Sequence, residues 1–389
     1  MVDPSDLDEL LRTLRRALRE KVVALLAEMD ERQELPESVR QLFVRLGLFA
    51  LVVPEAYGGL GLNLTHLCRV IEEVATVDAS LAVLVQAPAT ALRPLLLAGT
   101  PEQQARYFGE VASRGALFAF GLTEPQAGSD AASLVTRAER AGDGYILSGQ
   151  KRFVTNGDIA DYYVVFGRTG AGRGGISAFV IPAGAPGLSA GKHESKMGLR
   201  ASPTTDLFLE GVRVLESARI GAEGEGFGLL TATFTTSRPT IAAQAVGLAQ
   251  AALDAACAYA LERRQFGRAI ADFQGLRFLL ADMATEIEAA RALTYLASGE
   301  YDAGRPSPAL AAMAKCFASD VAMRVATDAV QVFGGYGFLK DYGVERLMRD
   351  AKITQIYEGT NQIMRVIIAR ELLKKPGASP AAPGDGATA

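Results

Sequence analysis

The chain has 389 residues, 49% of them hydrophobic, with 40 basic and 44 acidic side chains and a formal net charge of −4. This length predicts two or three domains, and the apolar content is sufficient for a core that encloses a cofactor. Because charges of both signs are interspersed, we exclude the concentrated basic surface of a nucleic-acid-binding protein.

The sequence lacks targeting and metal-binding patterns. Its first residues do not have the basic-then-apolar order of a signal peptide, and no stretch approaches about 18 uninterrupted apolar residues. The three cysteines (Cys68, Cys257 and Cys316) are far apart, and His66 and His193 lack the spacing of metal ligands. We therefore expect a soluble, cytoplasmic protein with no membrane span and no metal site.

Three blocks follow one another along the chain. Residues 1–118 are predicted to form a helical domain, because apolar residues recur at spacings of three and four from Leu7 to Leu25. Residues 119–230 are rich in glycine and predict a small antiparallel β-domain. Its short β-rich runs are at 145–147, 162–166, 176–181 and 207–214.

Helical periodicity returns over residues 231–373. The predicted helices are near 238–262, 272–299, 307–332 and 344–350. Residues 374–389 are mostly Pro, Gly, Ala and Ser, which predicts a disordered tail. The order of the blocks indicates an α+β protein.

Glu358 is the candidate catalytic residue. It follows the run Ile356-Tyr357, precedes Gly359, and comes just before a helical stretch over residues 361–373 that Thr360 can cap. A carboxylate aimed from such a turn and partly removed from water has the raised pKa that a base needs to take a proton from carbon. An ordinary acidic residue near a helix start has the same pattern, so this interpretation depends on the segments described next.

Two segments of the β-rich block suit a flat, phosphorylated cofactor. The loop over residues 120–130 combines Gly and Pro with the hydroxyls of Thr123 and Ser129, which can hold a polar ring edge and a pyrophosphate. Residues 151–157 place Phe153 beside Thr155, which offers an aromatic face next to a hydroxyl. A plain surface turn and a core aromatic are the structural alternatives.

Two segments of the carboxyl-terminal block have related features. Residues 263–267 supply guanidinium groups that can pair with phosphate, and Gln274 follows them. Gly334 and Gly335 let the backbone approach a ligand closely, although a helix C-cap would use glycine in the same way. The sequence has neither a Gly-x-Gly-x-x-Gly motif after a strand nor a Walker-type loop, which argues against a nicotinamide-binding Rossmann domain or an ATPase.

In this order, these segments resemble the acyl-CoA dehydrogenase family over residues 5–373. The most specific matches are residues 122–130, 263–267, 327–335, 347–352 and 357–362. The resemblance implies an amino-terminal helical domain, a middle antiparallel β-domain and a carboxyl-terminal four-helix bundle, assembled as a homotetramer. It also implies FAD as the cofactor, held between the β-domain and the bundle.

The resemblance divides the FAD contacts into three groups. The flavin ring and pyrophosphate would lie against Phe120, Thr123, Ser129, Phe153 and Thr155. The adenosine half of the FAD of a neighbouring subunit would meet Arg263, Gln265, Phe266, Gln274, Gln331, Gly334 and Gly335. Thr360 and Gln362 would contact the FAD of their own subunit.

By the same resemblance, Glu358 matches the base that removes the α-proton of an acyl thioester while the β-hydrogen leaves as hydride, which gives the trans-2-enoyl product. Electrons would pass to an electron-transfer flavoprotein. The substrate would be held by Ser129, Arg238, Glu358 and Gly359. Some relatives carry the base just before an arginine of the first bundle helix, but that position here is Ser237, which cannot act as one. Phe153 stands where many relatives have Trp, and this chain has no Trp.

The substrate stays open at this point. We expect residues 80–96 and 237–250 to set the pocket depth, and Gln86 to floor a short pocket, which favours a short- or medium-chain acyl-CoA. A dehydrogenase of an acyl-carrier-protein-bound substrate in a biosynthetic pathway is one alternative, because both carriers present the same phosphopantetheine arm. An acyl-CoA oxidase, reverse use as an enoyl reductase and a helical scaffold without catalysis are further alternatives. Peroxide formed under air would indicate the oxidase, and an FAD-free protein would indicate the scaffold.

Overall fold

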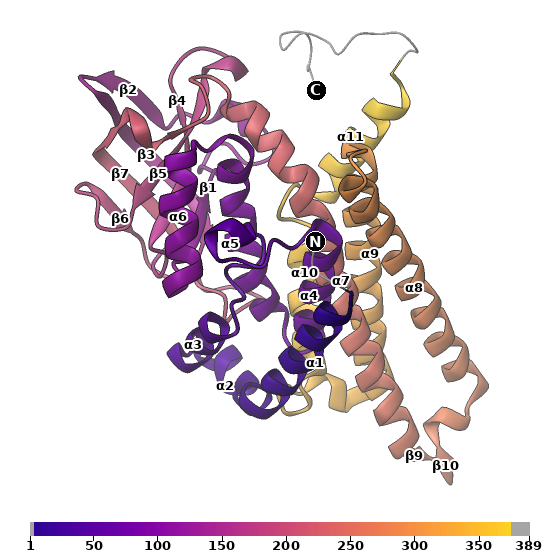
Figure 1. Cartoon of the computed structure of the whole chain (residues 1–389). Coiled ribbons are helices and arrows are strands. Elements are labelled where there is room, and N and C mark those ends of the chain that lie inside the picture. Colours follow the sequence, from indigo (N-terminus) through magenta and orange to yellow (C-terminus); the bar gives the residue numbers. More distant parts are fainter. Residues whose placement is uncertain (1–3, 375–389) are drawn as a thin grey trace.

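The structure is a computed structural model, and it describes residues 4–374. The predicted tail therefore lies almost entirely outside the described residues. Within them, helices form the two ends of the chain and strands form its middle (Figure 1). The amino-terminal helices are α1 (Pro4–Lys21), α2 (Leu26–Arg32), α3 (Glu37–Arg45), α4 (Leu64–Ala75), α5 (Ala79–Ala98) and α6 (Pro101–Arg114).

The middle domain is a single eight-stranded sheet. Its strands are β1 (Phe118–Gly121), β2 (Arg137–Ala141), β3 (Gly144–Thr155), β4 (Tyr162–Arg168), β5 (Ile176–Pro182), β6 (Leu188–Ala190), β7 (Thr204–Leu215) and β8 (Arg219–Ile220). The strand order is β6-β7-β3-β2-β4-β5-β8, and β1 pairs with β4. All four predicted β-rich runs fall inside these strands.

The sequence predicts an antiparallel sheet, but the observed sheet is mixed. β1 pairs in parallel with β4, with Phe118 opposite Tyr162, and β2 meets the end of β4 in parallel as well. A parallel pair needs a crossover connection, and the β2–β3 hairpin between β1 and β4 provides it. A run of short alternating segments does not reveal this pairing.

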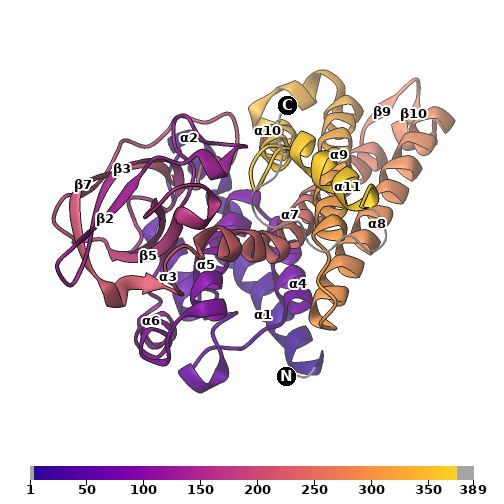
Figure 2. The same ribbon diagram turned by 90° about the horizontal axis from the view of Figure 1, so that it is seen from above.

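The carboxyl-terminal domain is a helical bundle. Its helices are α7 (Gly226–Glu262), α8 (Gln274–Asp302), α9 (Pro308–Phe333), α10 (Val344–Thr354) and α11 (Asn361–Leu372), and the short strands β9 (Arg264–Gln265) and β10 (Arg268–Ala269) join α7 to α8. Figure 1 and Figure 2 show α7 running from the β-domain into the bundle. This helix therefore connects the β-domain to the bundle.

The helix that the sequence predicts from about residue 238 begins earlier, at Gly226. Residues 226–237, which the prediction leaves out, are rich in threonine, whose β-branched side chain lowers helix propensity. In the structure this segment is nevertheless helical, and its threonine hydroxyls bond to carbonyls of the preceding turn. Thr231 Oγ1 donates to Phe227 O at 2.8 Å, and Thr233 Oγ1 donates to Leu229 O at 2.8 Å.

Two helices are long and apolar enough to cross a membrane by length and composition alone, namely α5 and α7. In the structure, 72% of the most apolar window of α5 and 67% of that of α7 are buried inside the protein. A helix that is apolar all round and enclosed by other elements is typical of a protein core. Here both helices form walls of the candidate site.

Candidate active site

The Glu358 turn has an uncommon backbone conformation. Glu358 lies between α10 and α11 with φ of +55°, and Gly359 follows with φ of +95°. A non-glycine residue in the left-handed region is uncommon and costs free energy, which the surrounding contacts must offset. Thr360 caps α11, as predicted, because its side chain accepts a hydrogen bond from Ile363 N at 3.3 Å. The turn thus aims the half-buried carboxylate from the start of a helix.

The carboxylate is held by a hydroxyl from α7. Ser237 Oγ donates to Glu358 Oε2 at 2.6 Å, and Ser237 is buried. From the sequence alone, Ser237 is only a residue that cannot serve as the base. The structure gives it a different role, because its hydroxyl fixes the orientation of the carboxylate and stabilises its charged form.

Opposing effects set the pKa of Glu358. Burial raises this pKa above its ordinary value, while the hydrogen bond from Ser237 and the positive charges of Arg238 and Lys315 partly offset the increase. Arg238 is itself buried, and its guanidinium lies 5.4 Å from the centre of the Phe234 ring. Loss of water lowers the pKa of Arg238 to about 10, so this residue remains a cation at neutral pH. The result is a partly desolvated carboxylate with cations nearby, which is a suitable environment for a general base.

Lys315 holds the backbone of the same turn. Its Nζ donates to Gly359 O at 2.8 Å and to Asn361 Oδ1 at 3.0 Å, and its side chain is fully buried in α9. Asn361 Nδ2 donates in turn to Ser319 Oγ at 2.9 Å and to Asp320 Oδ1 at 2.7 Å. Burial lowers the pKa of Lys315 to about 8. Sequence reasoning missed this lysine, although a single lysine within an alanine-rich helix is a usable signal.

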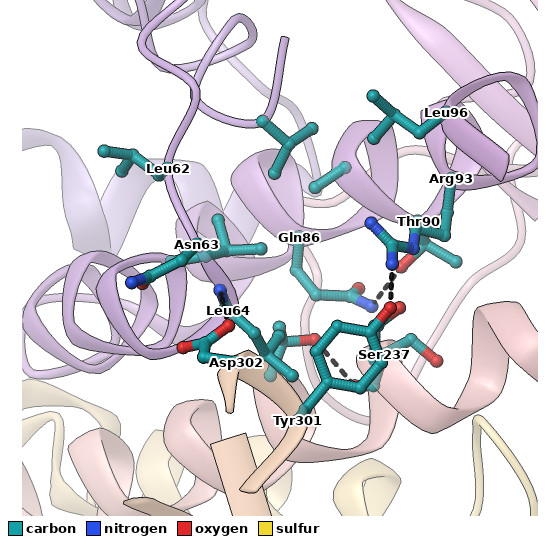
Figure 3. A pocket seen from close by; sticks show the side chains of 15 residues that line it. Leu62, Asn63, Leu64, Gln86, Thr90, Arg93, Leu96, Ser237, Tyr301 and Asp302 are labelled. Atoms are coloured by element: carbon teal, nitrogen blue, oxygen red, sulfur yellow. Dashed lines mark hydrogen bonds between the residues drawn. The ribbon is translucent and has the colours of Figure 1, made fainter. Parts of the chain in front are cut away.

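A cavity of about 160 Å³ is lined in part by Ser237, the residue that holds the Glu358 carboxylate (Figure 3). Its walls come from the start of α4, from α5, from α7 and from the end of α8. Ser237 lines it and holds Glu358 with the same side chain. Gln86 and Thr90 on α5 also line it, and Gln86 Nε2 donates to Thr90 Oγ1 at 2.8 Å. The two segments predicted to shape the pocket therefore meet in one cavity.

The first group of predicted FAD residues lies in the β-domain. Phe153 is 59% exposed, with φ of +58°, at a register shift between β3 and β7. A β-bulge re-aims a side chain, and here it leaves the Phe153 ring exposed, with the Arg152 guanidinium carbon 4.7 Å from the centre of that ring. Ser129 is exposed and Thr123 and Thr155 are half-buried, so their hydroxyls remain accessible. Phe120 packs against Phe166, with ring centres 5.2 Å apart.

A buried ion pair fixes the loop that carries Thr123 and Ser129. Lys151 Nζ donates to Glu124 Oε1 at 2.7 Å, and both side chains are buried. The Glu124 carboxylate also accepts the backbone N–H groups of Val135 at 2.6 Å and Thr136 at 2.9 Å. An exposed aromatic face beside a rigid, hydroxyl-bearing loop fits a flavin ring and its pyrophosphate.

The second predicted group lies elsewhere in the chain. Arg263, Gln265 and Phe266 lie at the β9–β10 hairpin, and Phe266 is 92% exposed with φ of +50°. The Arg263 guanidinium is 5.1 Å from the centre of the Tyr336 ring, which follows the exposed residues Gln331, Gly334 and Gly335 at the end of α9. Gln274, also exposed, begins α8 beside the hairpin. In Figure 1 the hairpin is at the end of the bundle that is remote from the sheet. One chain therefore does not bring the second group to the first.

The remaining predicted residues are near Glu358. Thr360 and Gln362 begin α11, and the Gln362 side chain is exposed. Arg238 and Gly359 are the immediate neighbours of Ser237 and Glu358 in the chain. Ser129 is exposed on its loop in the β-domain. None of the four predicted substrate residues is among those that line the cavity, which reaches Glu358 only through Ser237. The predicted contacts of these residues with FAD and substrate stay predictions.

Models of three domains of one family match the chain in succession. The acyl-CoA dehydrogenase N-terminal domain matches residues 4–115, the middle domain residues 119–212 and the C-terminal domain residues 224–373. Together these matches cover almost all of the described residues.

Individual proteins agree with the family models over nearly the full length. The chain is 47% identical over 375 residues to "Probable acyl-CoA dehydrogenase FadE25" of Mycobacterium tuberculosis, covering 95% of this chain and 96% of the relative. It is 48% identical over 350 residues to cyclohex-1-ene-1-carbonyl-CoA dehydrogenase of Geobacter metallireducens, covering 89% of this chain and 92% of that protein.

The solved structure of butyryl-CoA dehydrogenase from Megasphaera elsdenii superposes with a TM-score of 0.93 at 39% identity, covering 96% of this chain and all of that one. The fold, the arrangement of the Glu358 turn and these similarities lead to the same conclusion. The chain belongs to the acyl-CoA dehydrogenase family, whose members are FAD flavoproteins.

Proposed function

We propose that this enzyme dehydrogenates a short- or medium-chain acyl-CoA between its α- and β-carbons, with Glu358 as the base. The observation that carries this proposal is the hydrogen bond from Ser237, which lines the cavity, to the Glu358 carboxylate. An acyl group in this cavity would have its carbons next to the residue that holds the base. A positioned carboxylate whose pKa is raised by burial is well suited to take the α-proton.

Different residues of the chain would bind the cofactor, stabilise the developing charge and hold the Glu358 turn. The bound FAD supplies an acceptor for the β-hydrogen and its electron pair. Phe153 would cover the flavin ring, and Thr123 and Ser129 would bind its polar edge and pyrophosphate. The Glu358 backbone N–H would donate to the thioester carbonyl, which stabilises the negative charge that develops there as the α-proton leaves. Lys315 holds the turn in the conformation that this arrangement requires.

The size of the cavity supports a small acyl group. A cavity of about 150 Å³ accommodates benzene, and this one measures about 160 Å³. An acyl chain of about six carbons, or one carbocyclic ring, would fill such a space. The names of two similar proteins, butyryl-CoA dehydrogenase and cyclohex-1-ene-1-carbonyl-CoA dehydrogenase, refer to acyl groups of this order.

The electron acceptor is proposed to be an electron-transfer flavoprotein. One solved chain, from a study entitled "Electron transferring flavoprotein of Acidaminococcus fermentans: Towards a mechanism of flavin-based electron bifurcation", superposes with a TM-score of 0.93 at 44% identity, covering 96% of this chain and all of that one. The separation of the two groups of FAD residues supports a homotetramer, in which a neighbour supplies the second group. We place the enzyme in fatty acid metabolism in the cytoplasm.

A carrier-bound substrate is the second candidate. The solved structure of the prolyl acyl carrier protein oxidase AnaB superposes with a TM-score of 0.91 at 31% identity, covering 96% of this chain and all of that one. The same cavity would accept an acyl group from either carrier, because the phosphopantetheine arm is common to both.

An anaerobic titration tests both candidates. Purified holoenzyme is mixed with acyl-CoA thioesters from butyryl to decanoyl, and with the corresponding acyl carrier proteins, while the flavin absorbance is followed. The proposal predicts bleaching by the CoA thioesters, greatest at about four to eight carbons, and reoxidation by electron-transfer flavoprotein without peroxide. Bleaching only by the carrier-protein thioesters would favour the second candidate. Peroxide formed under air at the rate of turnover would indicate an oxidase.

A further inference from the structure

A guanidinium group forms part of the cavity wall. Arg93 on α5 lines the cavity and faces Tyr301 at the end of α8 (Figure 3). Its Nη2 donates to Tyr301 Oη, and its guanidinium carbon lies 5.3 Å from the centre of the Tyr301 ring. Arg93 is about 10 Å along the helix from Gln86, which lines the cavity as well.

The hydrogen-bonding capacity of Arg93 is mostly unused. A guanidinium has five N–H donors, and the structure gives Arg93 one acceptor, the Tyr301 hydroxyl. Its Nε is buried without a hydrogen-bond partner. Burial lowers the pKa of Arg93, with the negative charge of Asp302 opposing the change. A purely hydrocarbon acyl chain would displace water from these donors and leave them unsatisfied, which is unfavourable.

The charges in the cavity wall indicate which kind of substrate group could accept a hydrogen bond from Arg93. Arg93 and Asp302 are the charged side chains among the lining residues, and they have opposite signs. Asp302 is fixed in place, because its carboxylate accepts the backbone N–H groups of Leu64 at 2.9 Å and Thr65 at 2.8 Å. A carboxylate on the substrate would place a second negative charge in this half-enclosed space. A neutral oxygen would accept from Arg93 without adding charge.

We propose that the preferred acyl group carries a neutral oxygen, as a keto or hydroxyl group, beyond its reacting α- and β-carbons, and that Arg93 donates a hydrogen bond to that oxygen. This inference rests on the proposed function, since it requires that the cavity hold the acyl group. Arg93 is then a specificity-determining residue, and the substrate class narrows from simple short-chain acyl thioesters to oxygenated ones.

The test compares three thioesters of similar size. Hexanoyl-CoA has no oxygen in its acyl chain beyond the thioester, 5-oxohexanoyl-CoA has a neutral keto oxygen on carbon 5, and glutaryl-CoA has a carboxylate at that carbon. Each is measured with the wild-type holoenzyme, with Arg93→Met and with Arg106→Met, an exposed arginine on α6 outside the cavity. The readouts are the second-order rate of flavin reduction and the affinity measured by calorimetry. Affinity gives the selectivity even if no flavin reduction occurs, so failure of the proposed reaction is distinguished from failure of this inference.

The wild type should prefer 5-oxohexanoyl-CoA to hexanoyl-CoA by about tenfold or more in affinity. Arg93→Met should lower the affinity for 5-oxohexanoyl-CoA but not for hexanoyl-CoA, and so abolish or reverse the preference. Arg106→Met should retain the wild-type preference. Arg93→Lys, which keeps the charge but lacks the planar set of donors, should keep only part of it. Equal affinity for the two ligands in the wild type, or an unchanged preference in Arg93→Met, would overturn the proposal. Preference for glutaryl-CoA over both others would also overturn it, because the cavity would then bind an anion.

Discussion

The hydrogen bond from Ser237 to Glu358 should set the pH at which the enzyme becomes active. In Ser237→Ala the carboxylate loses a donor at 2.6 Å. A hydrogen bond to a charged group contributes about 1.5–3 kcal/mol, and one pKa unit corresponds to about 1.36 kcal/mol. Because Glu358 is only half-buried in the free enzyme, water would replace part of the lost interaction. We therefore expect the pKa of Glu358 to rise by about one unit.

The direction of the effect follows from the role of the base. Proton abstraction requires the carboxylate form, so the rate rises with pH through the pKa of Glu358. Ser237→Ala should move this acidic limb to higher pH by about one unit, with a smaller loss of rate above it. The assay is anaerobic stopped-flow flavin reduction at low acyl-CoA concentration from pH 5.5 to 9, because the second-order rate reports the pKa of the free enzyme.

Thr233→Val is the matched control for this experiment. Thr233 lies one helical turn before Ser237, and its hydroxyl donates to Leu229 O at 2.8 Å without contacting Glu358. This variant should keep the acidic limb of the wild type. If Ser237→Ala lowers the rate equally at every pH and leaves the limb in place, the reasoning is refuted, and Ser237 only packs against the turn.

Three other predictions follow from the same structure. Lys315→Met removes the two hydrogen bonds by which the ammonium group holds the Glu358 turn, so flavin reduction should fall by about tenfold or more in stopped flow while FAD content is retained; loss of FAD instead would contradict this role. Phe153→Ala removes the exposed aromatic face, so FAD affinity should fall up to about tenfold, measured as the flavin-to-protein absorbance ratio after gel filtration; undiminished FAD content would exclude Phe153 from the flavin site. Burial raises the pKa of Asp350 to about 7, so its contribution to stability is fully present below the ordinary pKa near 3.8 and is lost as pH rises through about 7. Asp350→Asn stays neutral, so its thermal midpoint relative to that of the wild type should rise between pH 5 and 8, and a constant difference would contradict the assignment.

The sequence predicted the features that depend on residues close together in the chain. The Glu358 turn, the Thr360 cap and the β-rich runs are local patterns, because the backbone and its immediate neighbours determine them. The order of helical and β-rich blocks along the chain was sufficient to predict the arrangement of two helical parts around a middle β-domain. The sequence places the start of α7 near residue 238, whereas the helix begins at Gly226 and includes a threonine-rich stretch whose hydroxyls bond to carbonyls of the preceding turn.

The contacts that tune the site could not be predicted in this way. Ser237 meets Glu358 across 121 residues, Lys315 meets Gly359 across 44, and Arg93 meets Tyr301 across 208. No periodicity in the chain encodes such pairings, which result from how α5, α7, α8 and α9 pack. The same packing determines how far burial changes the pKa values of Glu358 and Lys315.

The most direct test of the account is anaerobic flavin reduction by Glu358→Gln. The amide has the shape of the carboxylate and can still accept a hydrogen bond from Ser237, but it cannot take a proton. The account predicts that the variant keeps its FAD and binds acyl-CoA with near wild-type affinity. Reduction of its flavin by acyl-CoA should be slower by about 10²–10⁴-fold. Flavin bleaching at the wild-type rate would contradict the assignment of Glu358 as the base.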